Sequence, residues 1–312
     1  MDILLTEKSP EEKSKPASTF LDVELVSEPN LITDHLGIFT FKPKIDTESF
    51  PDFSPGKYIT LCVSREGLVD EVIDPKEVKK IQGKEVVPRP YSVASPPENK
   101  NIELYIAWIK GKGDGRRKTG EGILSTELFD PQPDTELMLI RGGKAQGKFL
   151  LPEDSRDVIM VATGTGIAPY MSMLRSDKIN HAGRKYVLIH GVGYASDMAY
   201  RAELNELEKI RDLTSLWSIS QENLKDHPEK YVQEFFFNRG GQSGVMEEEE
   251  LKDIRKEQIC NTRLEKILEK ELTPENSLVM LCGHPDMIES MELIAEAKGY
   301  KPGIDLITEE YW

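Results

Sequence analysis

The sequence has few cysteines, no long apolar run and no excess of basic charge. Its three cysteines, Cys62, Cys260 and Cys282, are too few and too scattered for a disulfide framework or an iron–sulfur cluster. No apolar run approaches the roughly 20 residues of a membrane-spanning helix, and the acid-flanked start is unlike a signal peptide. With 40 Lys and Arg against 55 Asp and Glu, the net charge of −15 argues against binding to nucleic acid. We therefore expect a cytoplasmic protein.

The chain is long enough for two domains, since its 312 residues exceed the ~100–200 of a typical domain. Residues 1–18 are rich in Glu, Lys, Ser and Pro, which predicts a flexible tail. Residues 19–152 contain short β-type runs separated by Pro and Gly, which favours an antiparallel β-barrel or sandwich. The runs cover residues 20–29, 37–43, 58–64, 85–95, 102–110 and 135–140. The charged residues 65–88 indicate a long loop or a hairpin between two of them.

The pattern changes at about residue 153. Residues 157–162 form a continuous apolar run, as expected of a parallel strand that is buried on both faces. Further strands are predicted at residues 186–190, 217–220 and 278–282. Because helical segments alternate with these strands, we predict a Rossmann-like parallel α/β sheet over residues 153–312. Residues 222–261 are highly charged and are interpreted as an insertion rather than core.

One candidate motif, Arg89-Pro90-Tyr91-Ser92, ends a predicted strand of the first half. A guanidinium suits a phosphate oxygen, a tyrosine ring suits another flat ring, and a serine hydroxyl can bond a ring nitrogen. Strand alternation sends Arg89 and Tyr91 to one face and Ser92 to the other, unless the strand bends at Pro90. An ordinary edge strand with an exposed arginine would show the same residues.

A second motif is a glycine turn at Gly122 with Ser125 as a cap, which predicts the start of a short helix. The free N–H groups at such a start favour a phosphate. An ordinary capped helix fits the same pattern.

A third motif follows the strand at residues 157–162, where Gly164-Thr165-Gly166 leads into a helix with Pro169 in its first turn. Glycines allow the backbone to approach a pyrophosphate, and the helix N-terminus favours its negative charge. The order strand, glycine turn, helix indicates dinucleotide binding more strongly than two glycines alone. Pro169 stands where the usual fingerprint has a third glycine.

A fourth motif, Cys282-Gly283-His284-Pro285, lies at the carboxyl end of a predicted parallel strand, where open α/β sheets bind ligands. The thiol could contact a nicotinamide, although a buried cysteine before a helix fits equally. His284 is expected to start that helix, because no second histidine or carboxylate pair gives it the spacing of a metal site.

The last residues form a fifth motif, Glu309-Glu310-Tyr311-Trp312. Two aromatic side chains at a frayed end would expose ~150–250 Å² of ring surface each. They are therefore expected to pack on something flat, either a ligand ring or the core of the protein itself.

The five motifs, in this order, resemble those of the ferredoxin–NADP reductase family, and most closely its bacterial flavoprotein branch that ends in Tyr-Trp. RPYS resembles the family's flavin motif, GTGIAP its pyrophosphate motif and CG its nicotinamide motif. The resemblance implies an FAD-binding β-barrel domain at 19–152 and an NAD(P)-binding α/β domain at 153–312. It also implies an FAD-dependent ferredoxin/flavodoxin–NAD(P)⁺ oxidoreductase, in which a hydride passes between the nicotinamide and flavin N5.

By this resemblance, Arg89 would hold the FAD pyrophosphate, Tyr91 would stack on one flavin face and Ser92 would lie near N5. Tyr311 would cover the other flavin face and Trp312 the adenosine side. The remaining FAD-binding residues implied are Pro90, Gly122, Leu124 and Ser125.

Glu309 matches the family's carboxylate near the nicotinamide. With Ser92, Cys282 and Tyr311, it would make up the catalytic set. The residues implied to bind NAD(P) are Thr163, Gly164, Thr165, Gly166, Pro169, Cys282 and Gly283.

The sequence departs from the NADP-specific pattern, since residues 190–194 and 218–222 contain no arginine for a 2′-phosphate. Possible substitutes are Arg184, Arg201, Arg239, Arg255 and Arg263. Asp197 could instead accept a hydrogen bond from a free 2′-hydroxyl, or it could cap the next helix. Use of NADH, or of both nucleotides, is expected slightly ahead of strict NADPH use.

An acidic ferredoxin or flavodoxin would be repelled by the net charge, so a local basic patch is expected to dock it. Such a patch is predicted at Lys110, Lys112, Arg116, Arg117 and Lys118. A solvated charged loop is the alternative.

Two rival functions share the motifs: an NADH-dependent reductase component of an oxygenase or another electron-transfer system, and a non-catalytic flavin-binding redox sensor.

Overall fold

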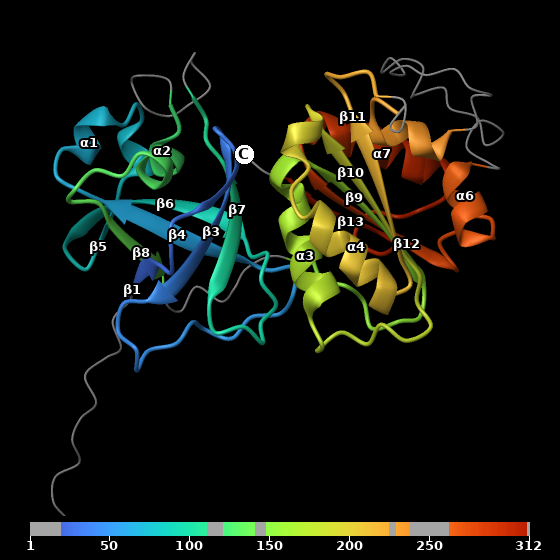
Figure 1. Ribbon diagram of the computed structural model, residues 1–312, viewed down its shortest axis with the longest axis horizontal. Coiled ribbons are helices and arrows are strands. Elements are labelled where there is room, and N and C mark those ends of the chain that lie inside the picture. Colours follow the sequence, from blue (N-terminus) through green and yellow to red (C-terminus); the bar gives the residue numbers. More distant parts are fainter. Residues whose placement is uncertain (1–19, 111–120, 141–147, 225–228, 238–261, 311–312) are drawn as a thin grey trace, which may run out of the picture.

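Two β-sheets lie side by side in the computed structural model (Figure 1). The structure describes residues 20–110, 121–140, 148–224, 229–237 and 262–310. The tail predicted at residues 1–18 lies outside them. Within the described ranges, every helix is too short or too polar to span a bilayer.

The first sheet is antiparallel and closes into a barrel. Its strands are β1 (Phe20–Leu25), β2 (Asn30–Thr33), β3 (Leu36–Pro43), β4 (Tyr58–Ser64), β5 (Lys79–Ile81), β6 (Lys84–Ser92), β7 (Ile102–Ala107) and β8 (Glu136–Ile140). They run in the order β2-β3-β1-β8-β4-β6-β5, and β7 pairs with β3. Val93, directly after β6, bridges to Leu104 of β7 and completes the ring of strands. The predicted antiparallel barrel is confirmed, while β2 and β5 were not among the predicted runs.

Alternation of apolar and polar residues explains why these strands face inward on one side. In β3, Phe39 and Phe41 are buried, whereas Thr40 and Lys42 are only half-buried. The inward side chains form one apolar cluster that fills the barrel and includes Leu61 of β4.

The charged residues 65–88 fold into short elements on the barrel. They form the helix α1 (Leu68–Glu71), the 3₁₀ turn η1 (Pro75–Glu77) and the hairpin of β5 and β6. Gln82 and Gly83 connect the hairpin with φ angles of 50° and 84°, as a tight two-residue turn requires. The helix α2 (Ile123–Phe129) packs on the barrel and buries Ile123 and Leu128 in the same apolar cluster.

The second sheet is parallel throughout. Its strands are β9 (Asp157–Thr163), β10 (Tyr186–Val192), β11 (Leu213–Ile219), β12 (Ser277–Gly283) and β13 (Leu306–Glu310), in the order β11-β10-β9-β12-β13. The helices are α3 (Ala168–Arg175), α4 (Arg201–Ile210), α6 (Arg263–Leu268) and α7 (Pro285–Ala297), and the 3₁₀ turns are η2 (Gly164–Ile167), η3 (Ala195–Asp197) and η4 (Val232–Phe236). The predicted Rossmann-like parallel sheet is confirmed.

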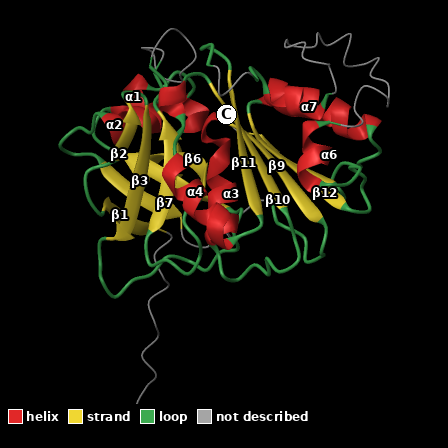
Figure 2. Ribbon diagram, turned by 45° about the vertical axis from the view of Figure 1, so that its right-hand side comes forward, coloured by secondary structure: helices red, strands yellow, loops and turns green. Residues whose placement is uncertain are grey.

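Helices cover both faces of this sheet, with α3 and α4 on one face and α6 and α7 on the other (Figure 2). Met160 and Ala162 of β9 pack into the cluster on the α3 side, and Ile159 and Val161 pack on the α7 side. Burial of both faces is the reason why β9 reads as a continuous apolar run.

The interpretation of residues 222–261 as an insertion outside the core is wrong for the described part 229–237. There η4 buries Val232, Phe235 and Phe236 in the same apolar cluster as α6 and α7. These apolar residues have many charged neighbours in the sequence, so the average composition of the segment did not indicate that they are buried. Residues 238–261 lie outside the described residues.

Candidate active site

Two turns meet at the carboxyl ends of β9 and β12, where the strand order of the parallel sheet reverses. Open α/β sheets bind their ligands at this point, because the loops diverge there and leave a crevice. The turn after β9 contains Gly164, whose φ of +53° is a left-handed conformation that favours glycine. Pro169 lies in the first turn of α3, as predicted.

The two turns are packed so closely that side chains are excluded between them. A Cβ atom on Gly166 would lie 2.2 Å from the carbonyl oxygen of Cys282, and one on Gly283 would lie 2.2 Å from the Thr163 hydroxyl. The same hydroxyl accepts a hydrogen bond of 2.8 Å from the His284 N–H. Gly166 and Thr163 therefore hold β9 against β12, in addition to any contact with a ligand.

A cavity of about 700 Å³ opens above these turns. Residues from both sheets line it, including Leu36, Tyr105 and Ala107 of the barrel. Of the predicted NAD(P)-binding residues, the cavity is lined by Thr163, Gly164, Thr165 and Gly283. Gly166, Pro169 and Cys282 are buried beside it instead.

His190 of β10 supports the glycine turn from below. Its side chain is fully buried against Trp217, and Nε2 lies 2.8 Å from the Gly164 carbonyl oxygen. Burial lowers the pKa of His190 to about 4, so the ring is neutral at physiological pH and Nε2–H donates to Gly164. Nδ1 has no hydrogen-bond partner within the described part of the chain. Its position in the sequence, inside a buried strand, gave no sign of this role.

His284 is the N-cap of α7, where its Nδ1 accepts a hydrogen bond of 3.2 Å from the Asp286 N–H. The prediction that it starts a helix is confirmed.

The strand β6 brings Arg89, Pro90, Tyr91 and Ser92 together on the barrel. Ser92 is buried, and its hydroxyl has no hydrogen-bond partner among the residues that the structure describes. Tyr91 packs on the barrel cluster, and burial raises its pKa above the usual value. Arg89 forms an ion pair with Glu77 of η1, so a phosphate would share or replace that carboxylate.

The expectation that Ser125 caps α2 is wrong. Gly122 is the N-cap, and Ser125 is the third residue of the helix. The first hydrogen bond of the helix joins the Thr126 N–H to the Gly122 oxygen over 3.2 Å, so the N–H groups of residues 123–125 precede the ladder. Ser125 is buried, and its hydroxyl lacks a hydrogen-bond partner in the described ranges, while Leu124 is buried beside it.

Glu309 of β13 lies opposite Cys282 in the strand register, so the two side chains project from the same face of the sheet. Burial raises the pKa of Glu309 from 4.5 to about 7, and the charge of Lys57 in the barrel opposes the shift. One carboxylate oxygen is buried without a hydrogen-bond partner among the described residues. This interaction with Lys57 places Glu309 at the boundary of the two sheets, and sequence reasoning missed Lys57. Tyr311 and Trp312 lie outside the described residues.

The structure separates the basic residues considered for a 2′-phosphate. Arg184 is buried and donates to the Pro152 oxygen over 3.0 Å, Arg263 pairs with Glu229, and Arg201 lines a different cavity. Arg239 and Arg255 lie outside the described ranges.

Lys230, which no sequence motif indicated, lines the cavity and donates to the Glu222 carbonyl oxygen. Asp197 also lines the cavity, and its carboxylate accepts a hydrogen bond of 3.0 Å from the Tyr194 N–H, which caps η3.

Of the predicted docking patch, the structure describes Lys110. Its ammonium group pairs with Asp34 over 2.8 Å and lies 4.5 Å from the ring centre of Trp108. Lys112, Arg116, Arg117 and Lys118 lie outside the described residues.

Comparisons with known proteins agree with this arrangement. A family model described as "Oxidoreductase NAD-binding domain" matches residues 160–292. The flavodoxin/ferredoxin–NADP reductase of Buchnera aphidicola subsp. Baizongia pistaciae is 31% identical over 239 residues, which cover 73% of this chain and 81% of that protein. The ferredoxin–NADP reductase of Azotobacter vinelandii is 27% identical over 215 residues, covering 68% and 73%.

A crystal structure of a ferredoxin NADP⁺ reductase from Neisseria gonorrhoeae with bound FAD and NADP has the same fold. Its TM-score is 0.64 at 23% identity, over 94% of this chain and 99% of that chain. The fold and the site define an oxidoreductase with a barrel and a dinucleotide-binding sheet. The chain belongs to the ferredoxin–NADP reductase family.

Proposed function

We propose that the chain is an FAD-dependent reductase of the cytoplasm that exchanges electrons between a nicotinamide dinucleotide and a ferredoxin or flavodoxin. The observation that carries this proposal is the cavity above Gly164 at the boundary between the sheets, which is lined by Leu36 and Tyr105 of the barrel as well as by the turns of the parallel sheet. The charge of Lys57 in the barrel also acts on Glu309 of β13 across this boundary. One side supplies polar groups for a flat ring, and the other supplies a turn for a pyrophosphate.

FAD fits the barrel side because buried polar atoms there lack hydrogen-bond partners that a ligand could supply. The hydroxyls of Ser92 and Ser125 are buried and have no hydrogen-bond partner in the described part of the chain. Leaving such groups unsatisfied costs about 1–3 kcal/mol each, so a ligand that bonds them would bind favourably. When bound, FAD supplies a ring that accepts a hydride and releases electrons one at a time.

The residues of the chain then have separate tasks. Arg89 and the N–H groups at the start of α2, next to Leu124, hold the FAD pyrophosphate, and Tyr91 packs on the ring. Ser92 bonds the ring edge from the barrel. Glu309, with its pKa of about 7, can hold or release a proton near neutral pH on the nicotinamide side.

The dinucleotide occupies the cavity, with its pyrophosphate on the turn of Thr163, Gly164 and Thr165. Backbone N–H groups and the start of α3 favour the negative charge there. Gly283, which lines the cavity without a side chain, would leave room for the nicotinamide. Cys282 and Gly166 act behind this surface by joining the two strands.

Lys230 decides the choice between NADPH and NADH in this proposal, because it is a basic side chain in the lining of the cavity. Replacing Lys230 by Met should lower kcat/KM for NADPH by about 10–100-fold, the value of a hydrogen bond to a charged group, and leave NADH unaffected. Steady-state kinetics with both nucleotides measure this. Equal losses of kcat/KM with NADPH and NADH would refute this role. Lys185→Met is the matched control, because Lys185 forms an ion pair with Glu269 and does not line the cavity.

The proposed function itself is tested by titrating the flavin-free protein with FAD and then measuring NADPH- and NADH-dependent reduction of ferricyanide. Binding of FAD followed by turnover supports a reductase. Binding without turnover would identify a flavin-binding sensor, and failure to bind FAD would exclude both.

A further inference from the structure

A buried arginine at the end of α3 joins the two halves of the molecule. The Arg175 guanidinium lies between Glu103 of β7, at 2.8 Å, and Glu203 of α4, at 2.6 Å. It also donates to the Ala94 carbonyl oxygen of the barrel over 2.8 Å. Only 13% of the side chain is exposed, so the charge depends on these acceptors rather than on water.

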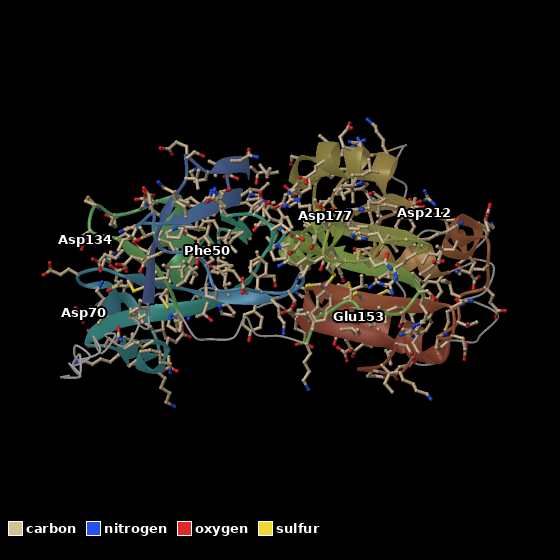
Figure 3. All side chains as sticks on the ribbon, turned by 90° about the horizontal axis from the view of Figure 1, so that it is seen from below. Phe50, Asp70, Asp134, Glu153, Asp177 and Asp212 are labelled. Atoms are coloured by element: carbon tan, nitrogen blue, oxygen red, sulfur yellow. The ribbon has the colours of Figure 1, made fainter. Side chains whose placement is uncertain are left out.

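Both views of the fold show α3 facing β7 across the boundary between the sheets (Figures 1 and 2). A neutral contact accompanies the charged one, since the Ser172 hydroxyl of α3 donates to the Ser95 oxygen over 2.7 Å. The Ser95 hydroxyl in turn accepts the Glu103 N–H over 3.0 Å. Seen from below, Asp177, two residues after the end of α3, lies in the parallel-sheet half (Figure 3).

Glu103 also holds a strained residue of the second half. Tyr200 has a φ of +62°, a left-handed conformation that costs a bulky residue about 1–3 kcal/mol and persists only where its surroundings enforce it. Its hydroxyl donates to Glu103 Oε1 over 3.0 Å, and its ring packs edge-on against Tyr105 of β7 at 5.6 Å. Arg175 lies over the same ring, 5.1 Å from its centre.

The contacts continue to the proposed nucleotide cavity. Tyr105 lines the cavity, and its hydroxyl donates to the Asp197 carbonyl oxygen at 3.4 Å. Asp197 is the last residue of η3, lines the same cavity and precedes Tyr200 by three positions. Glu103 and Arg175 therefore connect the barrel to the turn that borders the nucleotide.

We propose that Glu103, Arg175 and Tyr200 form a latch that fixes the nucleotide-binding turns relative to the barrel. None of the three touches the proposed flavin subsite, so they are positioning residues. The inference rests on the proposed function, because the two surfaces that the latch aligns are the flavin and nicotinamide subsites. A misplacement of 1 Å between reacting groups can cost about 100-fold in rate, so a loosened latch should slow hydride transfer at saturating nucleotide.

The test compares Arg175→Met with wild type in the FAD-loaded protein. The expected result is normal FAD content with a fall of about 100-fold in the rate of flavin reduction at saturating nucleotide. Arg175→Lys keeps the charge and should recover part of the rate, and it also serves if Arg175→Met fails to fold. Arg211→Met is the matched control, since Arg211 joins the Leu174 oxygen to Asp177 within the second half and should leave the rate unchanged.

A second measurement does not depend on activity. Spin labels are placed on the barrel and on the parallel-sheet half through Asp70→Cys and Asp212→Cys, two exposed positions on opposite halves (Figure 3), in a Cys260→Ser background. The distance distribution between the labels should broaden in Arg175→Met and stay narrow in Arg211→Met.

The latch requires both results. A wild-type reduction rate in Arg175→Met, or an unbroadened distance distribution, overturns it. If the wild-type flavin is reduced by neither nucleotide, the proposed function fails instead, and the spin-label distances alone decide on the latch.

Discussion

Replacing Glu309 by Gln should stabilise the protein at alkaline pH and leave its stability unchanged at acid pH. Burial raises the pKa of Glu309 from 4.5 to about 7, so the folded state keeps its proton to a higher pH than the unfolded state does. Stability therefore falls as the pH rises from 4.5 to 7, the interval in which only the unfolded carboxyl ionises. At 1.36 kcal/mol for each pKa unit, the loss is at most about 3 kcal/mol.

Urea unfolding of the flavin-free protein at pH 4 and pH 8 measures this effect. Gln cannot ionise, so Glu309→Gln should match wild type at pH 4 and exceed its free energy of unfolding by up to about 3 kcal/mol at pH 8. Glu310→Gln is the control. The Glu310 side chain is exposed, so this substitution should leave the free energy of unfolding close to that of wild type at both values of pH. Equal stability of Glu309→Gln and wild type at both values of pH would show that the carboxyl is not desolvated, and the proton-holding role would then lose its basis.

Two further predictions concern the glycine turn. Gly166→Ala should destabilise the flavin-free protein by about 3 kcal/mol, because the new methyl group would lie 2.2 Å from the Cys282 carbonyl oxygen. Gly164→Ala should cost about 1 kcal/mol, because its surroundings are open and only the φ of +53° is unfavourable. Urea unfolding measures both losses, and a larger loss in Gly164→Ala would contradict this prediction. His190→Leu should weaken nucleotide binding about fivefold, because it removes the hydrogen bond to the Gly164 oxygen. His190→Gln keeps a donor near the Nε2 position and should recover most of the affinity. Fluorescence titration with the nucleotide measures both affinities. An identical affinity in His190→Leu and wild type would count against the positioning of the turn.

The sequence predicts the parts of this fold that depend on local patterns. The run at 157–162 indicates a strand buried on both faces, and the glycines that follow indicate a turn open to a ligand. Both predictions depend on residues that are neighbours in the chain. The C-terminal strand β13 lacks such a run, because polar residues follow Leu306 and Ile307, and no local pattern predicts it.

The parts that sequence reasoning missed depend on contacts between distant residues. Lys57 and Glu309 are separated by most of the chain, and only folding brings their charges together. Glu103 and Arg175 are ordinary charged residues in the sequence, yet they are the core of the boundary between the two halves. Lys230 lies in the segment 222–261, whose high charge led to its interpretation as an insertion outside the core. No periodicity or spacing reports such pairs.

The ion pair of Arg89 and Glu77 has the same origin. The sequence predicts a free guanidinium for phosphate, whereas the structure folds η1 over the strand and gives Arg89 a carboxylate. FAD binding therefore involves competition or sharing at this arginine, which neither the motif nor its resemblance to a family indicated.

In the proposed function, the boundary between the two sheets transfers electrons from a nicotinamide through FAD to a small redox protein. Rapid anaerobic mixing of the FAD-loaded protein with NADPH or NADH, followed by addition of oxidised ferredoxin or flavodoxin, tests it directly. We expect the visible flavin absorption to be lost on mixing with at least one nucleotide and to return as the redox protein is reduced. Flavin absorption that stays unchanged with both nucleotides would contradict it.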